Sequence, residues 1–91
     1  MDNKENKLIE EAIRDAHKLY VIRWRDMYEN NTYITNVEAS TMREAIEKFK
    51  TEIVKLHVGT DNVRIDQVQS ESNGKRYYHM IYGKLNDLLY K

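Results

Sequence analysis

The stretch STMREAIEKFKTEIVKLHV, residues 40–58, decides the fold of this chain. Its apolar residues recur mostly at intervals of three and four, which is typical of one face of an α-helix and not of a β-strand. Thr41 and Glu44 have the spacing of a capping box, and Gly59 can take the left-handed conformation that ends a helix. We therefore expect an amphipathic helix that buries its apolar face against another element. The residues of that face are Met42, Ala45, Ile46, Phe49, Ile53, Leu56 and Val58.

Two strands are predicted before this helix, over residues 19–28 and 32–39. Both segments are rich in β-branched and aromatic side chains. A two-residue loop at Asn30-Asn31 would set a register that separates an apolar face from a face with a cross-strand ion pair. The apolar face, expected to pack on helices, pairs Ile22 with Ala39, Trp24 with Val37 and Tyr28 with Tyr33; the other face, expected to stay open, pairs Arg23 with Glu38, Arg25 with Asn36 and Met27 with Ile34.

Two more strands are predicted after the helix, over residues 63–70 and 76–82. Asn73-Gly74 between them is the strongest turn signal in the chain and matches a type I′ hairpin. The apolar residues of the first of these strands change phase after Ile65, which predicts a bulge near Asp66-Gln67. Both faces of the second strand are apolar, and we assign its core side to Tyr78, Met80 and Tyr82.

An amphipathic helix over residues 4–17 and a short helix capped by Asn86 complete the predicted elements. The order αββαββα predicts an α+β fold with a four-stranded, mostly antiparallel sheet and helices packed on one face. The central helix makes the second and third strands parallel to each other, with a right-handed crossover. We expect the strand order 2-1-3-4, with 1-2-3-4 as the alternative, in a single domain over residues 1–91.

Composition excludes several classes of protein. The 91 residues carry 15 basic and 15 acidic side chains, so a zero formal net charge argues against nonspecific electrostatic binding of nucleic acid. The chain has no cysteine, which excludes disulfides and thiolate metal sites. The short apolar runs and the polar N-terminus predict no membrane span, no signal peptide and a cytoplasmic location.

Catalytic and cofactor motifs are missing from the sequence. The three histidines, His17, His57 and His79, lie on separate predicted elements without metal-ligand spacing. No glycine-rich phosphate loop or nucleophile motif occurs either. We therefore expect no cofactor and no enzymatic activity.

Two candidate surfaces remain. Exposed apolar side chains beside arginines on the open sheet face indicate a protein contact or a homodimer. A basic and aromatic run in the last strand is instead typical of nucleic-acid binding, since arginines grip phosphates and aromatic rings stack on bases. The first candidate consists of Arg23, Arg25, Met27 and Ile34, and the second of Lys75, Arg76, Tyr77 and His79.

The sequence thus predicts a small non-enzymatic module that acts by protein–protein interaction. Its Asn-, Lys-, Ile- and Tyr-rich composition fits an accessory regulator or inhibitor from an AT-rich bacterium or phage. A nucleic-acid-binding protein that uses a basic and aromatic sheet face is the alternative. The first predicts salt-tolerant association, and the second predicts binding that falls steeply with salt.

Overall fold

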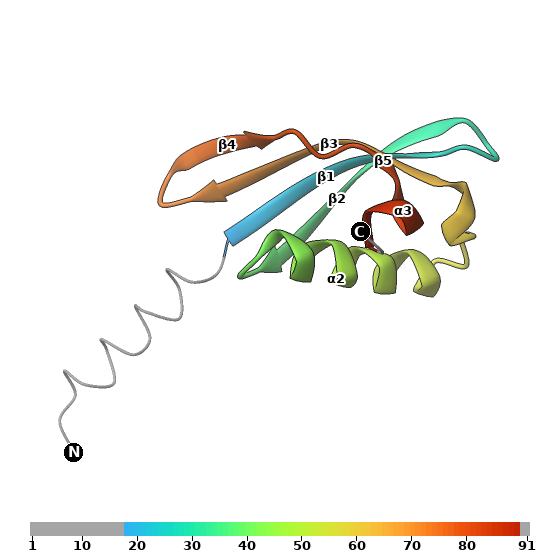
Figure 1. Ribbon diagram of the computed structural model, residues 1–91, viewed down its shortest axis with the longest axis horizontal. Coiled ribbons are helices and arrows are strands. Elements are labelled where there is room, and N and C mark those ends of the chain that lie inside the picture. The colour runs from blue at the N-terminus through green and yellow to red at the C-terminus, as the bar shows by residue number, and fades with distance from the viewer. Residues whose placement is uncertain (1–17, 90–91) are drawn as a thin grey trace, which may run out of the picture.

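An antiparallel sheet with helices against one of its faces forms the body of the molecule (Figure 1). This computed structural model describes residues 18–89, so the helix predicted over residues 4–17 lies outside the described part. The α+β class and the packing of the helices on one face agree with the prediction. The elements are β1 (Lys18–Asp26), β2 (Asn31–Ala39), α2 (Met42–Lys55), the 3-10 turn η1 (Thr60–Asn62), β3 (Val63–Ser72), β4 (Lys75–His79), β5 (Gly83–Lys84) and α3 (Leu85–Leu89).

The strand order is β2-β1-β3-β4, and the short β5 pairs with the beginning of β3, at Arg64 and Ile65. This confirms the order 2-1-3-4. Both β2 and β3 run antiparallel to β1, which lies between them, so they are parallel to each other as the crossover through α2 predicts. Because β1 and β3 are the inner strands, they supply most of the side chains that the sheet contributes to the core.

The predicted register of the first hairpin is wrong, although the predicted faces are right. Residues 27–30 form a four-residue turn, so Trp24 lies opposite Tyr33 and not Val37. The Asp26 carboxylate explains this turn, because its Oδ1 accepts the backbone N–H groups of Tyr28 and Glu29 at 3.0 and 3.4 Å. The shift relative to the predicted pairing is an even number of residues, so each side chain that remains in the two strands stays on its predicted face. The same shift puts Tyr28 in the turn, exposed, and separates Arg23 from Glu38.

The predicted bulge in β3 is confirmed. Arg23 pairs with Gln67 while the next residue of β1, Trp24, pairs with Ile65, so Asp66 is the extra residue. The insertion restores the phase of the strand, and Ile65 and Val68 both point into the core with no exposed surface.

The helix α2 begins as predicted. The Thr41 hydroxyl accepts the Glu44 N–H at 3.1 Å, and the Glu44 carboxylate reaches back to the Ser40 N–H at 3.3 Å. One face of the helix is buried against the sheet, through Ala45, Ile46, Phe49 and Ile53.

The predicted end of α2 at Gly59 is wrong. His57 takes the left-handed conformation, with a φ of 60°, and its N–H bonds to the Val54 carbonyl at 3.0 Å. The Val58 N–H bonds to the Ile53 carbonyl at 3.2 Å, which completes a Schellman motif. The helix therefore stops before Leu56, which is exposed and does not join the buried face.

Trp24 lies at the centre of the core, where its predicted burial is confirmed with 3% of its surface exposed. Its ring stacks on Tyr33 at a centroid distance of 4.8 Å and meets Phe49 edge-on at 5.7 Å. The indole N–H donates to the Thr35 hydroxyl at 2.9 Å, so the one polar atom of the ring is satisfied.

The second hairpin has the predicted turn but not the predicted core side. Asn73 and Gly74 have φ values of 52° and 76°, as a type I′ turn requires. This turn pairs Ser70 with Tyr77, and because Ser70 is buried, Tyr77 shares the helix-covered face and Tyr78 the opposite one. Tyr78 is therefore exposed, and the chain leaves the sheet before Met80 and Tyr82, which are exposed as well.

The last helix, α3, begins two residues earlier than predicted, at Leu85 instead of after Asn86. Leu85 is its buried anchor, and Asn86 lies inside the helix instead of capping it. The Asn86 side chain donates to the Asp61 carboxylate at 2.6 Å and so fastens α3 to η1. No helix within residues 18–89 is long and apolar enough to cross a membrane.

Candidate functional site

One face of the sheet is left without a covering helix by the described elements, since α2 and α3 lie together on the other side (Figure 1). Side chains alternate along each strand, and residues paired across neighbouring strands share a face. The register therefore assigns the members of this face directly. We call it the open face; it comprises Leu19, Val21, Arg23, Arg25, Thr32, Ile34, Asn36, Glu38, Arg64, Gln67, Gln69, Glu71, Arg76, Tyr78 and Lys84.

Arg23 occupies the middle of the open face. It lies between Ile34 on β2 and Gln67 on β3, and it makes no ion pair within residues 18–89. A hollow beside it is lined by these three residues together with Val21, Thr32, Tyr33 and Gln69. The Ile34 side chain beside it is 68% exposed.

Arg25 is positioned by the β3 bulge. The bulge turns the Asp66 carboxylate onto the open face, where it lies 3.4 Å from the Arg25 guanidinium and 4.0 Å from that of Arg64. All three side chains are partly exposed, so these pairs orient the arginines more than they stabilise the fold. Arg25 therefore belongs to a fixed cluster, whereas Arg23 is available for a partner.

Met27 does not lie where the sequence predicts it. It belongs to the turn after β1, where its N–H donates to the Asn62 carbonyl at 2.7 Å and its side chain is half-exposed. It is therefore not paired with Ile34 in the sheet. Of the first predicted set, the structure brings together Arg23, Arg25 and Ile34.

The second predicted set is divided between the two faces of the sheet. Arg76 lies on the open face opposite Glu71, with 4.0 Å between the charged groups. Lys75, Tyr77 and His79 lie on the helix-covered face because strand side chains alternate. The His79 Nε2 is 2.7 Å from the Ser70 hydroxyl, so this ring makes a structural contact at the border of the core.

The prediction missed Tyr78 and Arg64 as members of the open face. Tyr78 lies opposite Gln69 and is 68% exposed, like Ile34. Counting the residue pairs outward from the Asn73-Gly74 turn would have placed Tyr78 on the open face, because the turn fixes the pairing of β3 with β4. Arg64 depends on both the strand order and the bulge, and no local signal indicates it.

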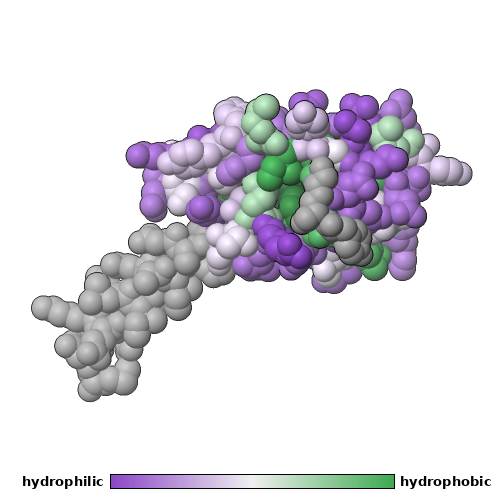
Figure 2. Space-filling view, in the orientation of Figure 1, coloured by the Kyte–Doolittle hydropathy of each residue, from purple (hydrophilic) through white to green (hydrophobic). Residues whose placement is uncertain are grey.

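The helix side of the molecule offers a second surface. Figure 2 shows hydrophobic residues gathered near the middle of the described part, in a view that is otherwise mostly hydrophilic. A hollow there is lined by residues from α2, α3 and the segment before β5, and its apolar members are Met42, Ile46, Met80, Ile81, Tyr82, Leu88 and Leu89.

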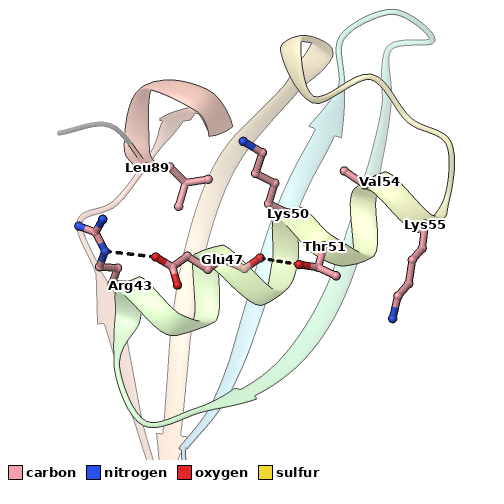
Figure 3. A pocket seen from close by; sticks show the side chains of 7 residues that line it. All are labelled: Arg43, Glu47, Lys50, Thr51, Val54, Lys55 and Leu89. Atoms are coloured by element: carbon pink, nitrogen blue, oxygen red, sulfur yellow. Dashed lines mark hydrogen bonds and ion pairs between the residues drawn. The ribbon is translucent and has the colours of Figure 1, made fainter.

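A neighbouring hollow on the outer side of α2 has a charged lining (Figure 3). Arg43 pairs with Glu47 at 3.2 Å, and the Thr51 hydroxyl donates to the Glu47 carbonyl at 3.2 Å. Val54 and Leu89 are the apolar side chains of this lining. Such pairs along one turn of a helix are typical of a solvated surface.

Titratable groups give no further candidate site in the described part of the chain. Burial raises the pKa of the Tyr20 hydroxyl, and the Glu44 carboxylate raises it further by opposing a second negative charge. Between residues 18 and 89, no three His, Asp or Glu side chains lie close enough together to hold a metal ion. Tyr20 faces the core next to His79, at a centroid distance of 6.1 Å, so its altered pKa bears on stability.

Comparison of this chain with protein-family models, with curated proteins and with solved structures gives no match. Function is therefore inferred from the open face itself.

Proposed function

We propose that this chain is a small cytoplasmic, non-enzymatic binding module that contacts a protein partner through its open face. The observation that carries the proposal is the exposure of Ile34 and Tyr78, 68% each, on either side of Arg23 and the half-buried Val21. Large apolar side chains exposed around an arginine are typical of protein interfaces, in which Arg and Tyr are enriched. A regulator or inhibitor would need no more than such a surface.

The rigidity of the open face also supports protein binding. Its strands are fixed from behind by the packing of Trp24 and Phe49, and Asp66 orients Arg25 and Arg64 from the side. A surface that is ordered before binding loses little conformational entropy when a partner docks. The open face can therefore bind with few contacts.

The charge of the open face favours protein over nucleic acid. Asp66, Glu71 and Glu38 also belong to the open face, and their carboxylates would repel a phosphate backbone. The basic and aromatic run is also divided, with Tyr77 and His79 on the other face. The residues of this run therefore do not form one continuous surface on which a nucleic acid could bind.

A photo-crosslinking side chain at Ile34 tests the proposal in cells that make the protein. Val54 is the matched control position, since it is also aliphatic and β-branched, is 57% exposed and lies on the outer side of α2. We expect a protein adduct from position 34 and not from position 54. Adding Arg23→Glu and Tyr78→Ala to the position-34 protein should reduce the adduct by about tenfold, as for central interface residues.

The double substitution Arg25→Glu with Met27→Glu, at two residues of the first predicted set, is a weaker test. Arg25→Glu removes the partner of Asp66, and Met27 belongs to a turn.

Three outcomes of the crosslinking experiment would each contradict protein binding at the open face. They are adducts that nuclease removes, equal adducts from positions 34 and 54, and no adduct at position 34.

A further inference from the structure

The charges of the open face are separated along the strands. Near the first hairpin lie Arg25, Arg64 and Lys84, with Asp66 as the one carboxylate among them; we call this the basic end. At the opposite ends of the same strands, Leu19 is flanked by Glu38 and Glu71, with Arg76 beside Glu71; we call this the acidic end.

Between the two ends, the open face is mostly uncharged. The cross-strand row Asn36, Val21, Gln69 and Tyr78 contains no acidic or basic residue, and Arg23 is the one charged residue of the next row. The face thus has a positive end, a flat middle with apolar and amide groups, and an end with excess negative charge.

We propose that the partner of the open face is a second copy of this chain, packed face to face about a two-fold axis that runs across the strands. This proposal deepens the proposed function and depends on it. Rotation about such an axis reverses the strand direction, so the basic end of each copy covers the acidic end of the other. Arg64 of each copy then faces Glu71 of its partner on the same strand, and the Val21 side chains lie near the axis.

The other two-fold arrangement is unfavourable. An axis along the strands would place the basic end of one copy against the basic end of the other and the acidic end against the acidic end, so like charges would meet at both ends. A zero formal net charge means that the two copies carry no overall repulsion. The polarity of the open face therefore selects one symmetric arrangement of two copies.

The size of the face sets the expected strength. Four strands about 4.8 Å apart, with about eight residues at about 3.4 Å each, span roughly 500 Å². Two such faces bury roughly 1,000 Å² in total, below the ~1,600 Å² of a standard stable interface. We therefore expect a weak, reversible dimer.

Sedimentation equilibrium of the purified full chain and two charge variants tests this pairing. Arg64→Glu makes the basic end acidic, and Glu71→Lys makes the acidic end basic. Each variant alone should raise the dimer Kd by about tenfold or more, because like charges would meet at both ends. An equimolar mixture should restore association close to that of the original chain, since each altered end then meets its complement.

Arg64→Ala provides a second route if Arg64→Glu destabilises the fold beside Asp66. It leaves the 3.4 Å pair of Asp66 with Arg25 intact, and it should raise the Kd by about fivefold. Circular dichroism and thermal melts establish that each variant is folded.

Three results would overturn the dimer: a chain that stays monomeric at about 1 mM, folded variants that associate like the original, and a mixture that does not recover. The crosslinking at Ile34 separates this failure from failure of the proposed function. A monomeric chain that still gives an adduct with a different protein keeps protein binding and rejects the second copy. An adduct with twice the mass of the chain supports both.

Discussion

Phe49 is the most informative single site for the packing of α2 on the sheet. Its side chain has no exposed surface, and its ring meets Trp24 edge-on at 5.7 Å. A buried phenylalanine removes about 200 Å² from water, equivalent to about 5 kcal/mol at about 25 cal/mol per Å². Phe49→Ala retains part of that burial and leaves a cavity, so we expect a loss of about 3–5 kcal/mol.

Urea unfolding followed by circular dichroism measures this loss. A domain of this length has a total stability of roughly 5–14 kcal/mol, so Phe49→Ala removes a large part of it. With an m-value of about 1 kcal/mol per M, the midpoint should fall by about 3–5 M, or the protein should be unfolded without urea.

Two further variants show whether the effect comes from packing. Phe49→Leu should lose only about 1–2 kcal/mol, because most of the apolar volume remains. Thr51→Ala, on the exposed side of the same helix, should change stability by less than about 0.5 kcal/mol. A loss below about 1 kcal/mol for Phe49→Ala would refute the assignment of this face of α2 to the core.

Four other predictions follow from the core and the turns. Trp24 should emit at short wavelength and resist quenching by iodide in the folded chain, whereas red emission with free quenching would contradict its burial. His57→Gly should raise the unfolding free energy by about 0.5–1 kcal/mol in urea melts, since glycine lacks the ~1–2 kcal/mol left-handed penalty but has more entropy to lose. Asp26→Ala should lower the unfolding free energy by about 1–3 kcal/mol because two turn N–H groups lose their acceptor, while Asp26→Asn, which keeps an oxygen there, should lose much less. The raised pKa of Tyr20 means that its stabilising contribution is present at neutral pH and is lost as the pH rises above about 10. The melting temperature of Tyr20→Phe should therefore fall less at alkaline pH than that of the original chain.

The parts of the fold that sequence predicts well depend on short-range signals. The beginning of α2 needs only the Thr41 hydroxyl within reach of the Glu44 N–H, a contact over three residues. The Asn73-Gly74 turn needs two residues that tolerate positive φ. The bulge at Asp66 is visible because the core must receive both Ile65 and Val68. In each case a few neighbouring residues decide the structure.

The first hairpin shows where such reasoning fails. Asn30-Asn31 resembles a two-residue loop, but only Asn30 takes positive φ, at 60°, and its N–H bonds to the Asp26 carbonyl at 2.7 Å. The deciding group is the Asp26 carboxylate four residues before Asn30, which is buried and accepts two N–H groups. A buried aspartate that opens a turn competes with the loop preference of the asparagines, and sequence alone does not rank the two effects.

The candidate site could be predicted only in part. Some of its residues can be assigned to the open face from the local sequence, whereas others require the strand order and register to be known. Arg23 and Ile34 are found from alternation alone, and a register error of an even number of residues leaves them on the open face. Placing Tyr78 on the open face requires the register of β3 with β4, which follows from the position of the second turn. Arg64 requires the strand order, the bulge and the pairing of β1 with β3 at once.

The separation of charge along the open face combines all of these constraints. Arg64 and Glu71 lie on the same strand seven residues apart, and without the bulge between them an odd separation would put them on opposite faces. The extra residue at Asp66 brings both onto the open face, and it also supplies the carboxylate that orients Arg64. One inserted residue therefore fixes the core packing of β3 and creates the charge pattern on which the proposed self-association depends.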